Sequence, residues 1–355
     1  MLTVIPFKIQ HSILKKMSPI LIGYGELLLR LTPIEHGNLL EQSDRLQMAF
    51  AGAEANILID LSLLGHPTSF MSAFPKNPVG RAAHQFLQKF GVHTQHLIWD
   101  EGRVGAYYIE HGTSIRGTRV TYDRANSSIC LAKIETEIWK QVFENASYFI
   151  LTGITPALSA ICQDNIKVAL EVAQSKGVKV VFDLNYRRTL WDAKAARHSF
   201  ESILPFVDIL IANTGAAYDV FDIKTSPIQD YESLQKASQQ ATDQLSVLGD
   251  FEWIGMTLRL QKSANKNILG GMIKKEDYFF STPLPTQIVD RLGGGDAFSA
   301  AMLHGIIHQW STTKIVQFAT AAFAATQTLH GDINYLTEEE LQSIADGNIR
   351  GFVKR

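Results

Sequence analysis

Cysteine is scarce in this chain, which has only Cys130 and Cys162 among 355 residues. Two cysteines cannot build a disulfide framework or a four-thiolate zinc site, so we expect a protein of the reducing cytoplasm. Long hydrophobic runs are also missing. No stretch of ~18 consecutive apolar residues is present, which argues against a membrane span.

An excess of charge is missing as well, because the formal net charge is -2. Nucleic acid and anionic membranes are therefore not expected as main partners. Two nucleotide-binding motifs are absent. No GxxxxGK[ST] occurs, and Leu28 stands where the glycine pair Gly23 and Gly25 would need a third glycine. The sequence thus excludes a P-loop and a dinucleotide fingerprint at this strand.

Residues 1–17 combine lysines with apolar residues but contain neither a signal-peptide core nor a cleavage pattern. We expect these residues to be a leader, either disordered or preceding a native start at Met17. Residues 18–355 then form one domain, since a single α/β domain with an appended piece can reach this length.

Four short apolar runs, at residues 148–152, 178–184, 207–212 and 253–258, are separated by helical segments. Continuous apolar runs are typical of parallel strands that are covered on both faces, so the sequence predicts an α/β fold with a mostly parallel central sheet.

Two segments have a different pattern. Residues 27–50 and 103–124 are β-rich without a helical period, and we expect them to form a small sheet that projects from the main body. This sheet is either a lid over a ligand or an edge ornament or dimer contact.

Polar residues follow the predicted strands at the points where the strands end. Ligands of such sheets gather beyond the carboxyl ends of the strands, so these residues should share one rim. They are Gly153, Asp183, Asn185, Arg187, Asn213, Thr257, Arg259 and the segment 293–296.

Three consecutive glycines, Gly293, Gly294 and Gly295, connect a strand end to a helix. Glycine permits backbone conformations in which several N–H groups converge on an anion at the helix N-terminus. Asp296 follows them directly. A carboxylate beside an anion site suits a proton acceptor in phosphoryl transfer. The alternative is a flexible turn in which Asp296 caps the helix.

Gly52, Glu54 and Asn56 stand at the start of another predicted helix. They either offer donors and acceptors to a ligand, or Asn56 caps the helix while Glu54 favours its dipole.

His304 and His308 lie one helical turn apart. No carboxylate accompanies them in the sequence and the other histidines are scattered, so we assign no metal site to them.

The segment Asp290-Arg291-Leu292-Gly293-Gly294-Gly295-Asp296 resembles the signature of the ribokinase-like, or pfkB-type, carbohydrate kinases. The arginine and the three glycines are similar to those of 2-dehydro-3-deoxygluconokinases. The resemblance covers nearly everything after Met17 and includes residues 52–56, 122–127, 152–158, 183–187, 257–259 and 331–332.

This resemblance implies a ribokinase-like three-layer α/β fold with a small β lid, and a homodimer. It also implies transfer of the ATP γ-phosphoryl group to the 6-hydroxyl of 2-dehydro-3-deoxy-D-gluconate, with ATP and Mg²⁺ as cofactors. By motif position, Asp296 would accept the proton and Gly293 to Gly295 would form the anion hole. Gly52, Asn56, Tyr107, Arg124, Arg187 and Asp332 would hold the sugar acid. Asn185, Asn213, Thr257 and Arg259 would lie toward ATP.

Elementary chemistry also favours Arg187 for the acid group, because a planar guanidinium can bind a carboxylate through two hydrogen bonds.

The sequence departs from the pattern of the family at one place, which concerns the metal. The family usually has acidic residues within three positions of the asparagine at 213, whereas here no carboxylate precedes Asp219. A kinase of a neutral sugar, or a sugar-acid-binding regulator with weakened catalysis, therefore stays an alternative.

Overall fold

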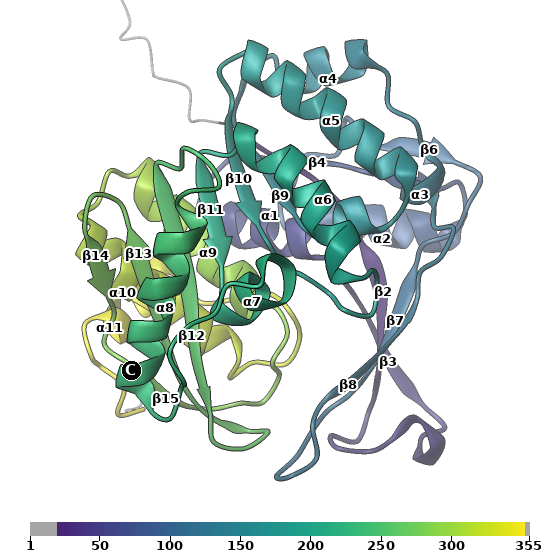
Figure 1. Ribbon diagram of the computed structural model, residues 1–355. Coiled ribbons are helices and arrows are strands. Elements are labelled where there is room, and N and C mark those ends of the chain that lie inside the picture. The colour runs from purple at the N-terminus through teal and green to yellow at the C-terminus, as the bar shows by residue number, and fades with distance from the viewer. Residues whose placement is uncertain (1–19, 352–355) are drawn as a thin grey trace, which may run out of the picture.

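A nine-stranded sheet forms the centre of the computed structural model, which describes residues 20–351 (Figure 1). The expected leader at residues 1–17 lies outside the described residues. The strand order is β14-β13-β12-β11-β10-β9-β1-β4, and β15 pairs with β13. The strands are β1 (Ile20–Tyr24), β4 (Thr68–Met71), β9 (Ala146–Thr152), β10 (Lys179–Asp183), β11 (Ile209–Ala212), β12 (Trp253–Gln261), β13 (Lys266–Lys274), β14 (Tyr278–Phe280) and β15 (Leu284–Gln287).

The six strands from β4 to β12 are parallel, which confirms the sheet predicted from the apolar runs. Strands β13, β14 and β15 pair antiparallel at one side. The apolar runs did not predict them. Two glycines interrupt the apolar residues of β13 and a lysine stands at each of its ends, so the chain lacks the continuous pattern of a buried strand.

Helices cover both faces of this sheet, and each face has its own hydrophobic core. One face is covered by α3 (Ser128–Leu131), α4 (Thr136–Val142), α5 (Ala160–Ser175), α6 (Ala193–Ile203), α7 (Thr214–Phe221) and α8 (Tyr231–Leu245). The other is covered by α1 (Ala53–Leu63), α2 (Pro78–Lys89), α9 (Gly294–Ile307), α10 (Thr312–Thr326) and α11 (Glu338–Ala345). The three-layer α/β architecture is therefore confirmed. Within residues 20–351, every helix is too short or too polar to cross a membrane.

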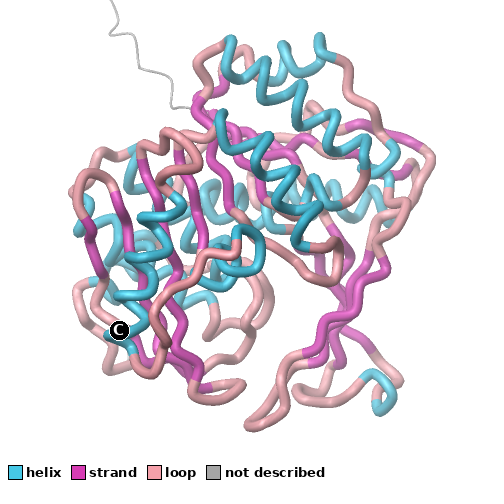
Figure 2. The backbone as a smooth tube through the Cα atoms, viewed as in Figure 1, coloured by secondary structure: helices cyan, strands magenta, loops and turns pink. Residues whose placement is uncertain are grey.

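A four-stranded sheet in the order β3-β2-β7-β8 projects from the main body as a curved arm (Figure 2). Its strands are β2 (Leu28–Pro33), β3 (Leu46–Ala51), β7 (Ala106–Glu110) and β8 (Arg119–Asp123). They fall within the two segments that the sequence marked as β-rich, except that β3 extends one residue further, to Ala51. In β8, apolar and polar residues alternate and so do half-buried and exposed side chains, unlike in the continuous apolar runs of the central strands.

The remaining elements are short. Strands β5 (Ala73–Pro75) and β6 (Ile98–Asp100) form a two-stranded sheet, and single 3-10 turns lie at Leu40–Gln42, Thr155–Ala157 and Leu204–Phe206. Because the central strands are parallel, their carboxyl ends and the N-termini of the helices that follow meet at one edge. The projecting sheet borders the same edge.

Candidate active site

A pocket of about 400 Å³ lies at this edge, between the central sheet and the projecting sheet. Its size is typical of small-molecule sites. All but one of the predicted site residues line it: Gly52, Asn56, Tyr107, Arg124, Asn185, Arg187, Asn213, Thr257, Arg259, Gly293, Gly295, Asp296 and Asp332. Gly294 does not line the pocket. It is buried beneath the wall, where an added Cβ would lie 2.8 Å from the amide nitrogen of Gln327.

The three-glycine turn ends in helix α9. Gly293 is the N-cap with a φ of +74°, and an added Cβ would lie 1.9 Å from the carbonyl oxygen of Asp332. Only glycine tolerates both conditions. The first backbone N–H groups of a helix have no partner within the helix, so this turn directs donors and the positive end of the dipole toward the pocket. An anion fits there.

Asp296 is the third residue of α9 and does not cap it, so the capping alternative is wrong. Asp296 is a buried residue, 8% exposed. Its carboxylate accepts a hydrogen bond from Asn56 Nδ2 at 2.8 Å. Burial raises the pKa of Asp296 to about 7, and the nearby charges of Asp183 and Asp332 add to this shift. A carboxylate with this pKa can take up and release a proton near neutral pH.

Two further polar groups come from the end of β10. Burial raises the pKa of Asp183 to about 6. The backbone N–H of Asn185 donates to Asp183 Oδ1 at 3.0 Å, and Asn185 has a φ of +32°. This turn places the amide side chain of Asn185 on the pocket wall.

The start of helix α1 forms the opposite wall. Gly52 is its N-cap, and a Cβ there would lie 2.0 Å from the carbonyl oxygen of Glu26. Asn56 does not cap the helix; its Oδ1 accepts from the Gly52 N–H at 3.2 Å while its Nδ2 binds Asp296. Asn56 therefore links the beginning of α1 to the predicted proton acceptor.

Glu54 has a role that the sequence did not reveal. Its Oε1 accepts hydrogen bonds from the Thr152 N–H at 3.0 Å, the Thr152 hydroxyl at 2.8 Å and the Thr155 hydroxyl at 2.7 Å. It fixes the end of β9 against α1. Burial raises the pKa of Glu54, while these hydrogen bonds lower it.

Three ion pairs on the side of the projecting sheet were also missed. Arg124 Nε donates to Glu26 Oε2 at 2.8 Å, and both side chains are buried. Arg30, on β2, donates to the carboxylates of Asp290 and Asp332. Arg30 stands in a segment that reads only as β-rich, and Glu26 stands just before it. Pairing partners this far apart in the chain leave no sequence signal.

Asp332 lies in the loop after α10 and is bound by two residues of the projecting sheet. The Tyr107 hydroxyl lies 3.3 Å from each of its carboxylate oxygens, and Arg30 binds it from β2. Burial raises the pKa of Asp332, and the charge of Arg30 opposes that rise. This carboxylate is therefore positioned by two residues of the projecting sheet.

Arg187 lies at the end of β10 and is half-buried. Its Nη1 donates to the Tyr186 carbonyl at 3.4 Å, and it has no ion-pair partner within residues 20–351. The neighbouring Arg188, in contrast, binds Asp219 through two hydrogen bonds of 2.9 and 2.6 Å. Arg187 is thus a cation on the pocket wall that is available to a ligand, which rules out the surface ion pair as its role.

The other end of the pocket carries Asn213, Thr257 and Arg259. Asn213 caps α7, since its side chain accepts from the Ala216 N–H at 2.9 Å. Burial, with a contribution from Arg291, lowers the pKa of Arg259 to about 9. Among the described residues, Arg259 Nη1 is buried without a hydrogen-bond partner. A buried donor of this kind favours an anionic ligand at this end.

Known proteins resemble this chain over nearly its full length. The profile of the pfkB family carbohydrate kinases matches residues 21–339. A 2-dehydro-3-deoxygalactonokinase of Haloferax volcanii is 33% identical over 336 residues, which is 94% of this chain and 99% of the relative. The crystal structure of a 2-dehydro-3-deoxygluconokinase from Thermotoga maritima has a TM-score of 0.88 at 34% identity and covers 93% of this chain and 100% of its own.

A more distant structure from E. coli was solved in complex with ATP and Mg²⁺. It is 18% identical with a TM-score of 0.76, covering 92% of this chain and 99% of its own, and so shows a shared fold. The family profile and the two closer relatives together identify the class of enzyme. The chain belongs to the pfkB family of carbohydrate kinases and is an ATP-dependent carbohydrate kinase.

Proposed function

We propose that the enzyme phosphorylates a 2-dehydro-3-deoxy sugar acid, 2-dehydro-3-deoxy-D-gluconate, at its 6-hydroxyl. The names of the relatives support a substrate of this class but differ in the configuration of the sugar, gluconate in one and galactonate in the other. One observation carries the proposal: Arg187 shares a pocket with Asp296 and has no ion-pair partner within residues 20–351. A neutral sugar would leave this half-buried guanidinium without a carboxylate at ion-pair distance among the described residues.

The proposed mechanism divides the work among the walls of the pocket. Arg187 binds the carboxylate of the sugar acid, and Tyr107, Arg124, Gly52 and Asp332 surround the sugar. Asp296 accepts the proton of the 6-hydroxyl as that oxygen attacks the γ-phosphorus of ATP, and the bond from the γ-phosphorus to the β-phosphate oxygen breaks so that ADP leaves. The N–H groups of the Gly293–Gly295 turn stabilise the negative charge on the transferred group. Asn56 holds the Asp296 carboxylate in position through its 2.8 Å hydrogen bond.

Arg259 supports the assignment of ATP to the opposite end of the pocket, because a guanidinium whose buried Nη1 has no hydrogen-bond partner suits phosphate oxygens. Asn185, Asn213 and Thr257 would lie beside it. For Mg²⁺, the lining offers oxygen groups from Asp183, Asn185 and Asn213, the ligand type this ion takes. Bound Mg²⁺ would neutralise charge on the β- and γ-phosphates.

The family usually has acidic residues after the asparagine at position 213. Asp219 does not take their place here, because it is bound to Arg188. We infer that phosphate oxygens and water hold most of the coordination shell of Mg²⁺ here. If the enzyme instead binds the sugar acid tightly but consumes no ATP with Mg²⁺ present, the alternative of a weakened, regulatory relative would be correct.

The test compares Arg187→Gln with Arg188→Gln on an acidic and a neutral substrate. We expect Arg187→Gln to lower kcat/KM for 2-dehydro-3-deoxygluconate about 100-fold, equivalent to about 3 kcal/mol, because a charged pair is lost. Arg188→Gln should change it little, since that side chain is exposed and pairs with Asp219. Equal losses on both substrates would favour a neutral-sugar kinase.

We also infer a cytoplasmic homodimer. Both cysteines are buried free thiols, as suits a reducing compartment.

The proposed dimer contact lies on the projecting sheet. Leu46 and Met48 of β3 are 37% and 60% exposed, and Ile34 after β2 is 50% exposed. These apolar side chains suit a contact between two such sheets. Light scattering on the chain and on Met48→Glu tests this, with a monomer expected for the variant only.

A further inference from the structure

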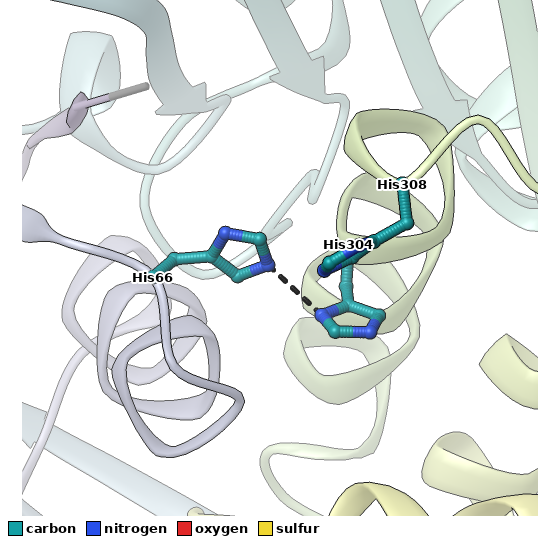
Figure 3. Close-up of side chains that lie close together, drawn as sticks. All are labelled: His66, His304 and His308. Atoms are coloured by element: carbon teal, nitrogen blue, oxygen red, sulfur yellow. Dashed lines mark hydrogen bonds between the residues drawn. The ribbon is translucent and has the colours of Figure 1, made fainter. Parts of the chain in front are cut away.

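Three histidines converge at the end of the molecule opposite the pocket. His66 follows helix α1, while His304 and His308 lie one turn apart near the end of α9 (Figure 3). Each offers a ring nitrogen, and these three atoms all lie within 4.8 Å of one another. The sequence showed only the pair on α9, because His66 is more than 200 positions away in the chain.

Local backbone geometry brings His66 to the pair. Gly65 ends α1 with a φ of +87°, and the His66 N–H donates to the Leu61 carbonyl at 3.0 Å. This left-handed helix ending reverses the chain. His66 Nε2 then lies 2.9 Å from His304 Nδ1, the contact drawn in Figure 3.

We propose that His66, His304 and His308 bind a divalent transition metal ion such as Zn²⁺. Two histidine nitrogens that bind one tetrahedral Zn²⁺ at about 2.0–2.1 Å lie about 3.4 Å apart, so the observed pair needs to open by only about half an ångström. His308 is exposed and its ring can rotate toward the other two. Water from the same side would complete the tetrahedron.

The site combines two buried rings with one exposed ring. His66 and His304 are buried, whereas His308 is exposed, so an ion can enter from the side of His308. Lys314, near the start of α10, lies over the Trp310 ring, 3.4 Å from its centroid.

A carboxylate stands behind the site. His304 Nε2 is buried and has no hydrogen-bond partner within residues 20–351, yet Glu338 Oε2 lies 3.6 Å away. If Nδ1 binds the metal, Nε2 carries the proton and directs it at Glu338. Metal-binding histidines usually donate their second nitrogen to a carboxylate in this way. Glu338 would give this buried nitrogen an acceptor once its carboxylate moves within hydrogen-bond distance.

The position of the site indicates what the metal would do. Helices α1 and α9 begin at the pocket with Asn56 and Asp296 and pack in one core. A metal between their other ends would join them and stabilise the folded chain, since any ligand that binds only the native state does so.

The experiment uses the full chain without a polyhistidine tag, stripped of metal. Titration with Co²⁺ should give intense visible absorption, the signature of tetrahedral coordination, and calorimetry with Zn²⁺ should give one site per chain. Zn²⁺ should raise the thermal midpoint by a few degrees.

Exposed residues provide variants that fold. His308→Ala should weaken Zn²⁺ binding about 100-fold or more, and Glu338→Gln about 10-fold. The matched controls are His198→Ala, an exposed histidine on α6, and Glu339→Gln, the neighbour of Glu338 on α11; both should bind as the original chain does. Zn²⁺ affinity that is unchanged in His308→Ala, or a Co²⁺ spectrum of the octahedral type, would overturn the proposal.

Discussion

At the scale of single residues, the chemistry of this kinase centres on one buried carboxylate. Asp296 is held by Asn56, shielded from water and flanked by two other aspartates. These surroundings make it a stronger base than an exposed aspartate. Nearby Asp183 and Asp332 share the burial but differ in their partners, since Arg30 binds Asp332. Environment, rather than residue type, separates the three carboxylates.

Replacing Asp296 by asparagine should therefore remove turnover but not binding. We expect Asp296→Asn to lower kcat by about 100- to 10,000-fold, because general base catalysis contributes about that much. The dissociation constant of the sugar acid should change little, since Arg187 is intact. Stopped-flow turnover and calorimetry measure the two quantities. Near-normal turnover would refute Asp296 as the proton acceptor.

The pH dependence follows from the same residue. Asp296 must be ionised to accept a proton, so kcat/KM should rise with pH through about 7, near the pKa of Asp296. The stability of the fold should instead decrease as the pH rises. A carboxyl whose pKa is raised by folding contributes stability that is full below about pH 4 and is lost as pH rises through about 7.

Asp296→Asn removes this charge, so the variant should be more stable than the original chain at pH 8, by up to about 4 kcal/mol, and not at pH 4. Urea unfolding at the two pH values measures the difference. A gain of the same size at both pH values would mean that charge burial is not the cause.

At the scale of elements, helix starts determine where the pocket lies. Helices α1, α7 and α9 begin at the edge of the sheet, and they differ in whether a side chain caps their first N–H groups. Asn213 caps α7 with its own side chain, while α1 and α9 begin with Gly52 and Gly293 and have no side-chain cap. The two uncapped starts therefore leave donors for ligands.

The glycines of α9 should differ sharply in their tolerance of a side chain. Gly293→Ala forces a Cβ against the Asp332 carbonyl at a φ of +74°, whereas a Cβ at Gly295 has nothing within 4 Å. We expect Gly293→Ala to destabilise the fold by about 2 kcal/mol or more, and Gly295→Ala by less than about 0.5 kcal/mol. Denaturant unfolding measures both. Similar values for the two variants would contradict this account of the turn.

At the scale of the whole molecule, Arg30 joins the projecting sheet to the two loops that carry Asp290 and Asp332. It extends from β2 to Asp290, before the glycine turn, and to Asp332, which also binds Tyr107 of β7. Asp290 in turn accepts from the Gly331 N–H at 3.1 Å. The projecting sheet and the catalytic loop are thus connected through buried charges, so movement of one is linked to the position of the other.

Removing this connection should cost much of the stability. Arg30→Met leaves two buried aspartates without their cation, and such losses are typically about 3–5 kcal/mol. The exposed ion pair of Arg103 with Asp123, in the same sheet, is the control, and Arg103→Met should cost less than about 1 kcal/mol. Chemical unfolding followed by circular dichroism compares them. Equal effects would show that Arg30 is not a structural link.

The sequence by itself determined the class of fold and most of the pocket. Apolar runs predicted the parallel strands, because strands covered on both faces need continuous hydrophobic residues, and the polar residues at their ends predicted the shared edge. The residues of the glycine turn were found because their chemistry is local. Three glycines that can direct N–H groups toward an anion, and the aspartate beside them, are consecutive in the chain.

Only the tertiary structure decided which distant residues pair with one another through ion pairs and hydrogen bonds. Glu26 with Arg124, Arg30 with Asp290 and Asp332, and His66 with His304 are each separated by between 98 and 302 positions. No periodicity or spacing connects such residues, because long-range ion pairs and hydrogen bonds depend on how the sheets and helices pack. The pKa of Asp296 has the same origin, since burial by distant elements raises it.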